Sequence, residues 1–397
     1  MRKQVLSTAF AAAALVALAA GVQAKEYGPG VTDTEIKIGN TMPYSGPASA
    51  YGTIGKAHAA YFAMVNDQGG VNGRKINYIT YDDGYSPPRT VEQTRKLVEQ
   101  DEVLVLMAQL GTPSNTAIHK YVNSRKVPHL FLSTGASKWD DPENFPWTMG
   151  WQPNYPNETK GYGKHILKNN PQAKIAVLYQ NDDYGKDYLN GLKEGLGDKY
   201  AELVVSEVSY EVTDPTIDSQ MVTMKSSGAD TFVNITTPKF AAQAIKKAAE
   251  IDWKPVHYLN SVSNSVGAVL TPAGLENAKG IYSAFYLKDP VDPQWKDDKD
   301  FQEWTAWMDK YLPDGDKLSS FNVIGYAHAF TMVKVLEACG DELTRENVMK
   351  QAANMDFEAP MLLPGLRIQT SPTDFAPIED EHIGQFNGTS WDLQGAM

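Results

Sequence analysis

The sequence predicts an α/β protein made of two doubly wound parallel-sheet lobes that are joined by a three-segment hinge. Short apolar runs rich in β-forming residues alternate with longer segments of helical period, which is typical of βαβ units. The alternation breaks at residues 139–157, which are rich in proline, aromatic residues and Asp or Asn, and resumes afterwards. A chain of 397 residues with 42% hydrophobic residues also exceeds one ordinary core, so two domains are expected.

The start of the chain has the pattern of a secretory signal peptide, predicted over residues 1–24. Two basic residues precede an apolar run over residues 11–20, which is too short to span a bilayer, and a small-residue cleavage pattern ends at Ala24. No other apolar run is long enough to cross a membrane, so we expect an exported periplasmic protein without membrane insertion. The single cysteine, Cys339, lies far from the cleavage site, so neither a lipid anchor nor an intrachain disulfide is expected.

Strand-like and helix-like segments divide the chain between the lobes. The predicted strands cover residues 36–42, 76–81, 103–108, 127–132, 175–179, 203–208, 231–235, 256–259 and 281–287. The predicted helices between them include a first one ended by Gly69 and Gly70, followed by 91–99, 116–124, 158–168, 184–195 and 240–250. A helix-only run over 300–354 indicates that the chain returns to finish the first lobe. The predicted N-terminal lobe therefore comprises residues 25–150 and 281–358, and the C-terminal lobe residues 151–280 and 359–397.

Two strand ends in the first lobe are unusually rich in small and hydroxyl residues. The strand over 103–108 leads into Gln109–Asn115, and the strand over 127–132 leads into Ser133–Ser137, which reads STGAS. Ligands gather at the carboxyl ends of parallel strands, and small residues allow close approach to backbone amides. Two interpretations compete for STGAS, a hydroxyl nucleophile and a cradle of backbone amides suited to a carboxylate.

The sequence lacks the residue patterns that catalysis, a metal site or a nucleotide cofactor would require. STGAS lacks a nucleophile elbow, and the adjacent Lys138 would point to the opposite side of an extended backbone, so no catalytic residue is assigned. The seven histidines are scattered without metal-ligand spacing, and no glycine-rich segment fits a phosphate loop. A formal net charge of −12 makes nucleic acid and anionic lipid poor partners. We expect no enzyme, no metal and no cofactor.

Several short motifs share their order and spacing with a known family. The motifs are IKIG at 36–39 leading to SGP at 45–47, Tyr51-Gly52, NDQGGVNG at 66–73, YDD at 81–83, STGAS at 133–137 and DYG at 183–185. Together they resemble the periplasmic leucine/isoleucine/valine-binding protein family, the type I solute-binding components of ABC importers, over essentially the whole mature chain. The resemblance implies two hinged lobes that close on a ligand in the cleft.

The resemblance also implies which residues bind the ligand. In the family, the two loops described above hold the α-carboxylate, which implies Gly111 and Thr112 on one side. The other side is then made by residues of the STGAS loop, namely Ser133, Gly135, Ala136 and Ser137. Tyr51 matches an aromatic residue that touches the ligand side chain, and Tyr184 matches a tyrosine that closes from the second lobe.

Departures from the family affect the expected ligand. Amino-acid binders place an acid after the strand that matches 256–259, whereas this chain has Asn260–Ser265 without any acid. A disulfide of some members, between positions matching Tyr85 and Gly111, is impossible here, so these two residues are expected to shape a different pocket. An aromatic-lined cleft is a further hypothesis, based on Tyr155 and three nearby tryptophans. The ligand is therefore a branched-chain or related amino acid, or an aromatic or aliphatic carboxylic acid lacking the amine, with the second slightly favoured.

The sequence thus predicts a monomeric periplasmic solute-binding protein that captures a small carboxylate-bearing ligand and delivers it to the membrane permease of an ABC importer. The alternative is a periplasmic sensing subunit that signals to a separate receptor. The sequence does not separate these two functions.

Overall fold

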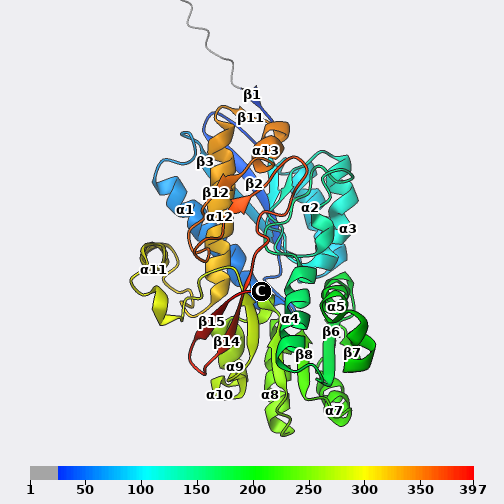
Figure 1. Cartoon of the computed structure of the whole chain (residues 1–397). Coiled ribbons are helices and arrows are strands. Elements are labelled where there is room, and N and C mark those ends of the chain that lie inside the picture. Colours follow the sequence, from blue (N-terminus) through cyan, green and yellow to red (C-terminus); the bar gives the residue numbers. More distant parts are fainter. Residues whose placement is uncertain (1–25) are drawn as a thin grey trace, which may run out of the picture.

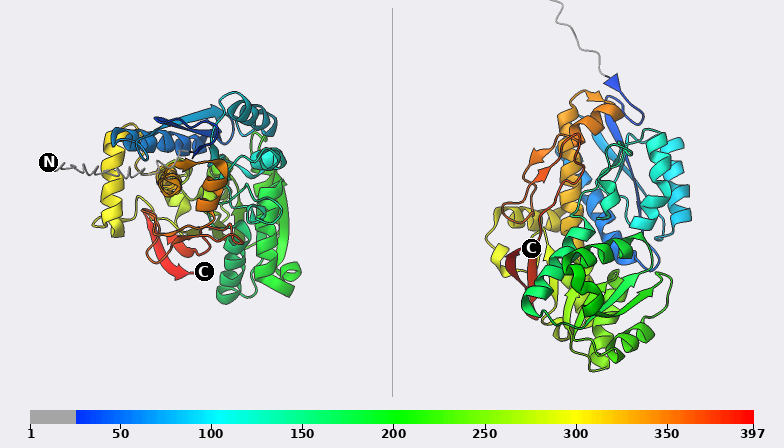
Figure 2. Two further views of the ribbon diagram at one scale, coloured as in Figure 1. Left: turned by 90° about the horizontal axis from the view of Figure 1, so that it is seen from above. Right: turned by 45° about the vertical axis from the view of Figure 1, so that its right-hand side comes forward.

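The structure is a computed structural model that describes residues 26–397, so the predicted signal peptide over residues 1–24 lies outside the described residues. Two sheets form two lobes that lie end to end, as two views show (Figures 1 and 2). Between residues 26 and 397, every helix is too short or too polar to cross a membrane. The two sheets and the lobes that they form confirm the predicted α/β fold with parallel-sheet lobes.

The first lobe is built on a four-stranded parallel sheet. Its strands are β3 (Lys75–Asp82), β2 (Glu35–Met42), β4 (Val105–Met107) and β5 (His129–Leu130), in that spatial order. Consecutive residues of β4 face opposite sides, so Val105 and Met107 join one core cluster while Leu106 joins another. Because both faces are covered, the strand is apolar throughout.

Helices cover the two faces of this sheet. On one face α1 (Gly52–Asp67) packs against α12 (Ser320–Cys339), and on the other α2 (Pro87–Glu99) packs against α3 (Thr112–Ser124) (Figure 1). The lobe also contains α11 (Lys299–Tyr311) beside α1 and α13 (Arg345–Ala352) beside α12. The late helices thus pack with the lobe that the first 130 residues begin.

The second lobe is built on a seven-stranded mixed sheet. Its strands are, in spatial order, β15 (Trp391–Ala396), β14 (His382–Phe386), β10 (Tyr282–Phe285), β9 (Val256–Leu259), β8 (Thr231–Ile235), β6 (Ile175–Gln180) and β7 (Val204–Tyr210). The strands from β7 to β10 are parallel, whereas β14 and β15 are antiparallel additions from the end of the chain.

Two helix pairs and several short helices flank the second sheet. The long helices are α4 (Tyr155–Asn169) with α5 (Asp183–Leu196), and α7 (Asp218–Ser226) with α8 (Pro238–Glu250). The short helices are α6 (Tyr200–Leu203), α9 (Thr271–Ala273) and α10 (Leu275–Ala278).

Two details differ from the expectation, and a third concerns the tail. The strand predicted over 127–132 is limited to β5, because Phe131 has a φ of +58° and turns the chain out of the sheet. The predicted helix-only run contains a short strand, β11 (Glu342–Leu343), which pairs with β1 (Glu26–Tyr27). The tail also pairs β12 (Asp356–Phe357) with β13 (Ile368–Gln369) before it reaches β14.

The lobe boundary predicted at residue 359 stays a prediction. Ile368 and Ile378 belong to the core cluster that contains Ile36 of β2, whereas Ile383 belongs to a core cluster of the second lobe. This packing favours a return to the second lobe close to His382.

Candidate functional site

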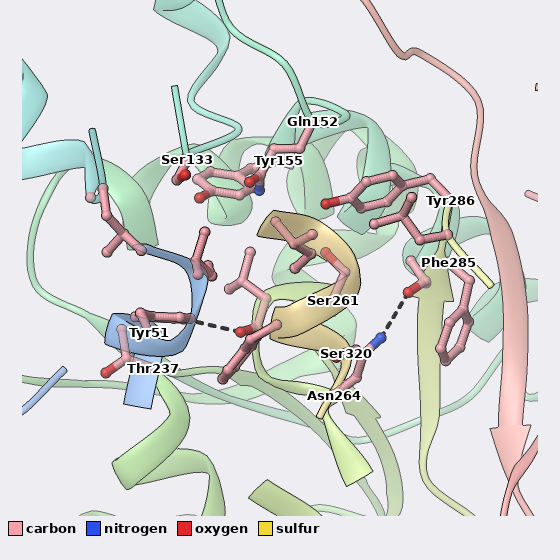
Figure 3. A pocket seen from close by; sticks show the side chains of 18 of the residues that line it. Tyr51, Ser133, Gln152, Tyr155, Thr237, Ser261, Asn264, Phe285, Tyr286 and Ser320 are labelled. Carbon is pink, nitrogen blue, oxygen red and sulfur yellow. Dashed lines mark hydrogen bonds between the residues drawn. The ribbon is translucent and has the colours of Figure 1, made fainter. Parts of the chain in front are cut away.

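A cavity between the two lobes contains most of the residues that the sequence indicated. It encloses about 770 Å³ of empty space, part of which is open to solvent. Its lining comes from both lobes and from the segments that cross between them, as a close view shows (Figure 3). The lining residues are Tyr51, Ile54, Tyr85, Leu110, Gly111, Thr112, Ser133, Gln152, Tyr155, Tyr184, Thr237, Ser261, Val262, Asn264, Ala284–Asp289, Ser320, Phe321 and Ile324.

The starts of several helices meet at this cavity. Lining residues lie at or next to the first residue of each of these helices, and they are Tyr51 for α1, Thr112 for α3, Tyr155 for α4, Tyr184 for α5, Thr237 for α8 and Ser320 for α12. The first turn of a helix carries N–H groups without an intrahelical acceptor and a partial positive charge. At α4 and α5 the side chains of Asn154 and Asp182 already accept one of these N–H groups each. The cavity therefore has an environment that favours an anionic group.

Five of the eight residues predicted to bind ligand line this one cavity, namely Tyr51, Gly111, Thr112, Ser133 and Tyr184. Tyr51 reaches across it, since its hydroxyl donates to the main-chain carbonyl of Val262 at 3.0 Å. Burial raises the pKa of the Tyr51 phenol well above its usual value, so the hydroxyl stays a donor. Tyr51 therefore ties the first helix of one lobe to a loop of the other.

The small residues at the two strand ends meet at the floor of the cavity. Gly111 has a φ of +96°, and a Cβ there would lie 2.5 Å from the ring of Tyr85, so only glycine fits. The hydroxyls of Thr112 and Thr134 are 2.6 Å apart, and Ser133 Oγ donates to the carbonyl of Ala108 at 3.1 Å. Tyr85 thus packs directly against Gly111 and both line the cavity, whereas the Ser133 proton already has an acceptor.

Gly135, Ala136 and Ser137 do not line this cavity. The carbonyl of Gly135 accepts from the Tyr155 N–H at 2.8 Å. Ser137 begins a 3₁₀ turn, Ser137–Trp139, and both its N–H and its hydroxyl donate to the carboxylate of Asp187 on α5, at 2.7 and 3.0 Å. Ala136 and Ser137 line a separate shallow depression beside α5. This part of the STGAS loop therefore holds a carboxylate of the same chain.

On the second lobe, Tyr184 is held by a buried amide. Its hydroxyl lies 2.5 Å from the side chain of Asn260, and burial raises the pKa of Tyr184 well above the usual value. With the Asn260 oxygen turned toward Tyr184, the Asn260 nitrogen donates to the carbonyls of Asn234 and Thr236 at 3.0 and 3.1 Å. The polar residues after β9 therefore position Tyr184 at the cavity.

Sequence reasoning missed an acid that lies beneath the same loop. Glu158 of α4 accepts from the N–H and the hydroxyl of Ser261 at 2.8 and 2.6 Å, and from the hydroxyls of Tyr162 and Tyr188 at 2.9 and 3.0 Å. Burial raises the pKa of Glu158, and these hydrogen bonds oppose the shift. Because its oxygens are occupied, Glu158 fixes the position of Ser261 in the cavity wall.

Two charged residues of the crossing after β10 were also missed. Lys288 is 4% exposed and its Nζ binds Asp298 and Asp300 at 2.7 and 3.1 Å. Asp289 is 5% exposed, and its Oδ1 accepts from the Val291 N–H at 3.0 Å. An acid two residues after a predicted strand, at a chain crossing, was the available signal for Asp289.

The aromatic-cleft hypothesis holds only for some of the residues behind it. Tyr155 lines the cavity, as do Tyr85 and Tyr286. Trp139 and Trp151 are instead buried in the hydrophobic cores, where they pack rather than face the cavity.

In the part of the chain that the structure describes, no three His, Cys, Asp or Glu side chains are grouped so that they could hold a metal ion.

The chain matches known proteins over most of its length. The sequence profile of a family described as periplasmic binding protein matches residues 35–390. A curated relative, Leu/Ile/Val-binding protein homolog 7 of Brucella abortus (strain 2308), is 23% identical over 247 residues, which is 60% of this chain and 61% of the relative. The matched region thus spans about three fifths of that relative's length.

Solved structures share the fold. A branched chain amino acid ABC transporter from Thermus thermophilus with bound valine has a TM-score of 0.82, with 16% identity and coverage of 92% of this chain and 97% of that one. An ABC transporter solute binding protein from R. palustris in complex with benzoate has a TM-score of 0.77, with 19% identity and coverage of 91% and 96%. Proteins of this family bind solutes and are not enzymes. With a profile match that covers nearly all the described residues, this chain belongs to the periplasmic binding protein family.

Proposed function

We propose that this chain is the solute-binding component of an ABC importer, which captures a small carboxylate-bearing ligand between its lobes and passes it to a membrane permease. The observation that carries the proposal is the meeting of six helix starts at one interlobe cavity. The partial positive charge of helix starts that border one space favours an anion without requiring a cationic side chain. The periplasm, as predicted from the sequence, is the proposed location, and a monomer is the proposed state.

The carboxylate is proposed to lie at the Gly111 and Thr112 end of the cavity. There the backbone starts α3, and the Thr112 hydroxyl can turn from Thr134 toward a ligand oxygen. Tyr51 and Tyr184 then flank the rest of the ligand. A branched-chain or related amino acid, or an aromatic or aliphatic acid, fits a cavity whose remaining wall is largely apolar, with Ile54, Leu110 and Phe321.

Titration calorimetry on the purified protein tests this proposal with matched ligand pairs. The pairs are L-valine with 3-methylbutanoate and L-phenylalanine with 3-phenylpropanoate, with benzoate as a further acid. At least one of these carboxylates is expected to bind. A panel without any binder at millimolar concentration contradicts the proposal.

A pair of variants tests where the ligand carboxylate lies. Thr112→Val removes the hydroxyl with little change in shape and is expected to weaken binding by about 0.5 to 1.5 kcal/mol. Thr116→Val removes a hydroxyl one helical turn further along α3, where it donates to the Thr112 carbonyl and does not line the cavity, so affinity is expected to stay the same. Equal affinities for both variants contradict the placement at Thr112.

A further inference from the structure

Tyr286 presents an unused hydroxyl group to the interlobe cavity. It directly follows β10 at a chain crossing, lines the cavity and is 6% exposed. Its hydroxyl forms no hydrogen bond with any of residues 26–397, and Figure 3 shows this hydroxyl directed into the cavity. The oxygen is accessible, unlike the sealed and unpartnered indole nitrogen of Trp304. A ligand in the cavity can therefore reach the Tyr286 hydroxyl.

Packing from two other segments fixes the Tyr286 ring. The indole of Trp151, on the first crossing between the lobes, meets this ring edge-on with the two centroids 5.9 Å apart. Trp151 is itself fully buried, and its Nε1 donates to Thr331 Oγ1 of α12 at 3.1 Å. The Tyr286 main-chain carbonyl accepts from the Leu363 N–H at 2.9 Å. A phenol hydroxyl moves with its ring, so the Tyr286 hydroxyl is held at one place in the cavity wall.

Most neutral polar side chains of the cavity wall already have a hydrogen-bond partner in the protein. The lining residues of this kind without a partner among residues 26–397 are Gln152, Tyr286 and Ser320. Ser320 begins α12 and belongs to the helix starts that favour an anion. Gln152 instead directly follows Trp151, whose ring contacts Tyr286, and its amide offers both a donor and an acceptor. Gln152 and Tyr286 are therefore two unused polar groups on neighbouring chain crossings.

The Tyr286 hydroxyl lies away from the proposed carboxylate end of the cavity. The Gly111 N–H donates to the Ser133 carbonyl at 3.3 Å, so Ser133 marks that end. Figure 3 shows Ser133 and Tyr286 on opposite sides of the cavity. A ligand whose carboxylate lies at Gly111 and Thr112 therefore directs its other end toward Tyr286.

The surroundings of Tyr286 favour a neutral partner for its hydroxyl. Burial, followed by the nearby Glu381, Tyr155 and Glu158, raises the pKa of Tyr286 well above its usual value, so the hydroxyl remains a donor. Negative charge on Glu158 also disfavours a second ligand carboxylate at this place. A ligand that fills the cavity displaces water from the hydroxyl, so an apolar ligand end would leave this donor unpaired.

We propose that Tyr286 is a specificity-determining residue that donates a hydrogen bond to a neutral oxygen of the ligand, a hydroxyl or carbonyl group at the end remote from the carboxylate, with Gln152 as a second partner. This inference rests on the proposed carboxylate-binding function and adds a second polar group to its ligand class. It holds for a ligand with or without an amine. A site built to hydrogen-bond such an oxygen rejects an analogue that lacks it, because the phenol donor is then left unpaired.

Calorimetry with size-matched ligand pairs tests the inference. Each pair replaces the remote oxygen by a methyl group, and the pairs are 3-(4-hydroxyphenyl)propanoate with 3-(4-methylphenyl)propanoate, L-tyrosine with 4-methyl-L-phenylalanine, 5-hydroxypentanoate with hexanoate, and 4-oxopentanoate with 4-methylpentanoate. Tyr286→Phe removes the hydroxyl and keeps the ring. The matched control is Tyr282→Phe, because Tyr282 lies on the same strand, also has no hydrogen bond from its hydroxyl to the described residues and does not line the cavity.

In the wild-type protein, at least one oxygen-bearing compound is expected to bind about tenfold more tightly than its methyl partner. Tyr286→Phe is expected to remove most of this preference by weakening the oxygen-bearing compound about 5- to 50-fold, while Tyr282→Phe retains it. Gln152→Leu is expected to reduce the same preference by a smaller factor. Should Tyr286→Phe not fold, Gln152→Leu carries the test, and a preference that survives it unchanged counts against the inference.

The inference is overturned if the methyl compounds bind as well as their partners in every pair, or if the preference for the oxygen survives in Tyr286→Phe. If a carboxylate binds in either case, the proposed binding function stands. Absence of binding by every carboxylate of the two ligand panels contradicts function and inference together.

Discussion

The carboxylate of Asp187 accepts two hydrogen bonds from Ser137, one from the N–H at 2.7 Å and one from the hydroxyl at 3.0 Å. Asp187 lies on α5 of the second lobe, and Ser137 follows the last strand of the first, so this pair joins the lobes. Next to it, Lys138 forms a 2.7 Å ion pair with Asp183. The loop that looked like a ligand cradle thus provides a contact that holds the lobes together.

Asp187→Asn is expected to weaken ligand binding about three- to tenfold without touching the ligand. The Asn side chain keeps one acceptor oxygen, but its NH₂ group would face one of the two hydrogen-bond donors of Ser137. The closed arrangement therefore loses stability. Stopped-flow kinetics should show the loss as faster dissociation. Asp183→Asn, which alters only an exposed ion pair beside it, is the control and should change affinity little. Unchanged dissociation in Asp187→Asn would show that the pair does not stabilise closure.

Tyr51→Phe should lower affinity by about 0.5 to 1.5 kcal/mol, because it removes the hydroxyl that binds the Val262 carbonyl across the cavity. Tyr44→Phe is the control, since its hydroxyl binds Thr80 within one lobe at 2.8 Å. Calorimetry should find an effect on ligand affinity for Tyr51 only. An equal effect of both variants would assign the loss to general stability.

Gly111→Ala should destabilise the protein and reshape the ligand site. Its φ of +96° costs about 1 kcal/mol or more for alanine, and the new Cβ would collide with Tyr85. Gly73→Ala isolates the backbone cost, since Gly73 has a φ of +80° with nothing within 4 Å of an added Cβ. Thermal unfolding should show a larger loss for Gly111, accompanied by weaker ligand binding. Similar losses for both would mean that the Tyr85 ring moves aside.

Glu158→Gln should destabilise the loop after β9. Four donor groups face the Glu158 carboxylate, and an amide nitrogen in place of one oxygen would confront at least one of them. A loss of about 1 to 3 kcal/mol in the free energy of unfolding is expected, measured by urea denaturation. Glu194→Gln alters an exposed ion pair with Lys160, and its loss in the free energy of unfolding should be a few tenths of the loss for Glu158→Gln. Comparable losses would argue against a positioning role for Glu158.

The ligand-free protein should lose stability as the pH rises from 5 to 8, in part through Asp289. Burial raises the pKa of Asp289 from an ordinary 3.8 to about 7, and the nearby charge of Asp292 adds to the shift. A group whose folded pKa is raised contributes its full stability below the unfolded value, and that stability is lost as the pH passes through the folded value.

The measurement is the difference in Tm between the wild-type protein and Asp289→Asn at each pH. The Tm of the variant should rise relative to that of the wild-type protein as the pH rises to 8, because the variant has no carboxyl group to ionise at this position. Taking the difference removes the contribution of buried histidines such as His58, whose pKa burial lowers to about 3 and whose effect has the opposite sign. Parallel curves would show that Asp289 does not titrate in this range.

The alternation of short apolar runs and helical segments determined the fold class, and β2 and β3 follow the predicted runs within about one residue. Periodicity is a local property, so each βαβ unit could be recognised from its own residues. The length of the strand before STGAS was overestimated, because the turn at Phe131 depends on a positive φ that an apolar residue type does not predict. The antiparallel β14 likewise finds its place only by pairing with β10, about a hundred residues earlier, and β15 then pairs with β14.

For the site, the sequence indicated Gly111, Thr112 and Ser133 because they follow strand ends where ligands gather, and it indicated Tyr51 and Tyr184 through the resemblance to the family. Only the tertiary structure decided that Ser137 faces Asp187, that Glu158 supports Ser261 and that Asp289 enters the cavity wall. The first two relationships join residues 50 and 103 positions apart, and the third depends on a chain crossing. Charge pairing and burial are set by such long-range packing, which no local pattern in the sequence contains.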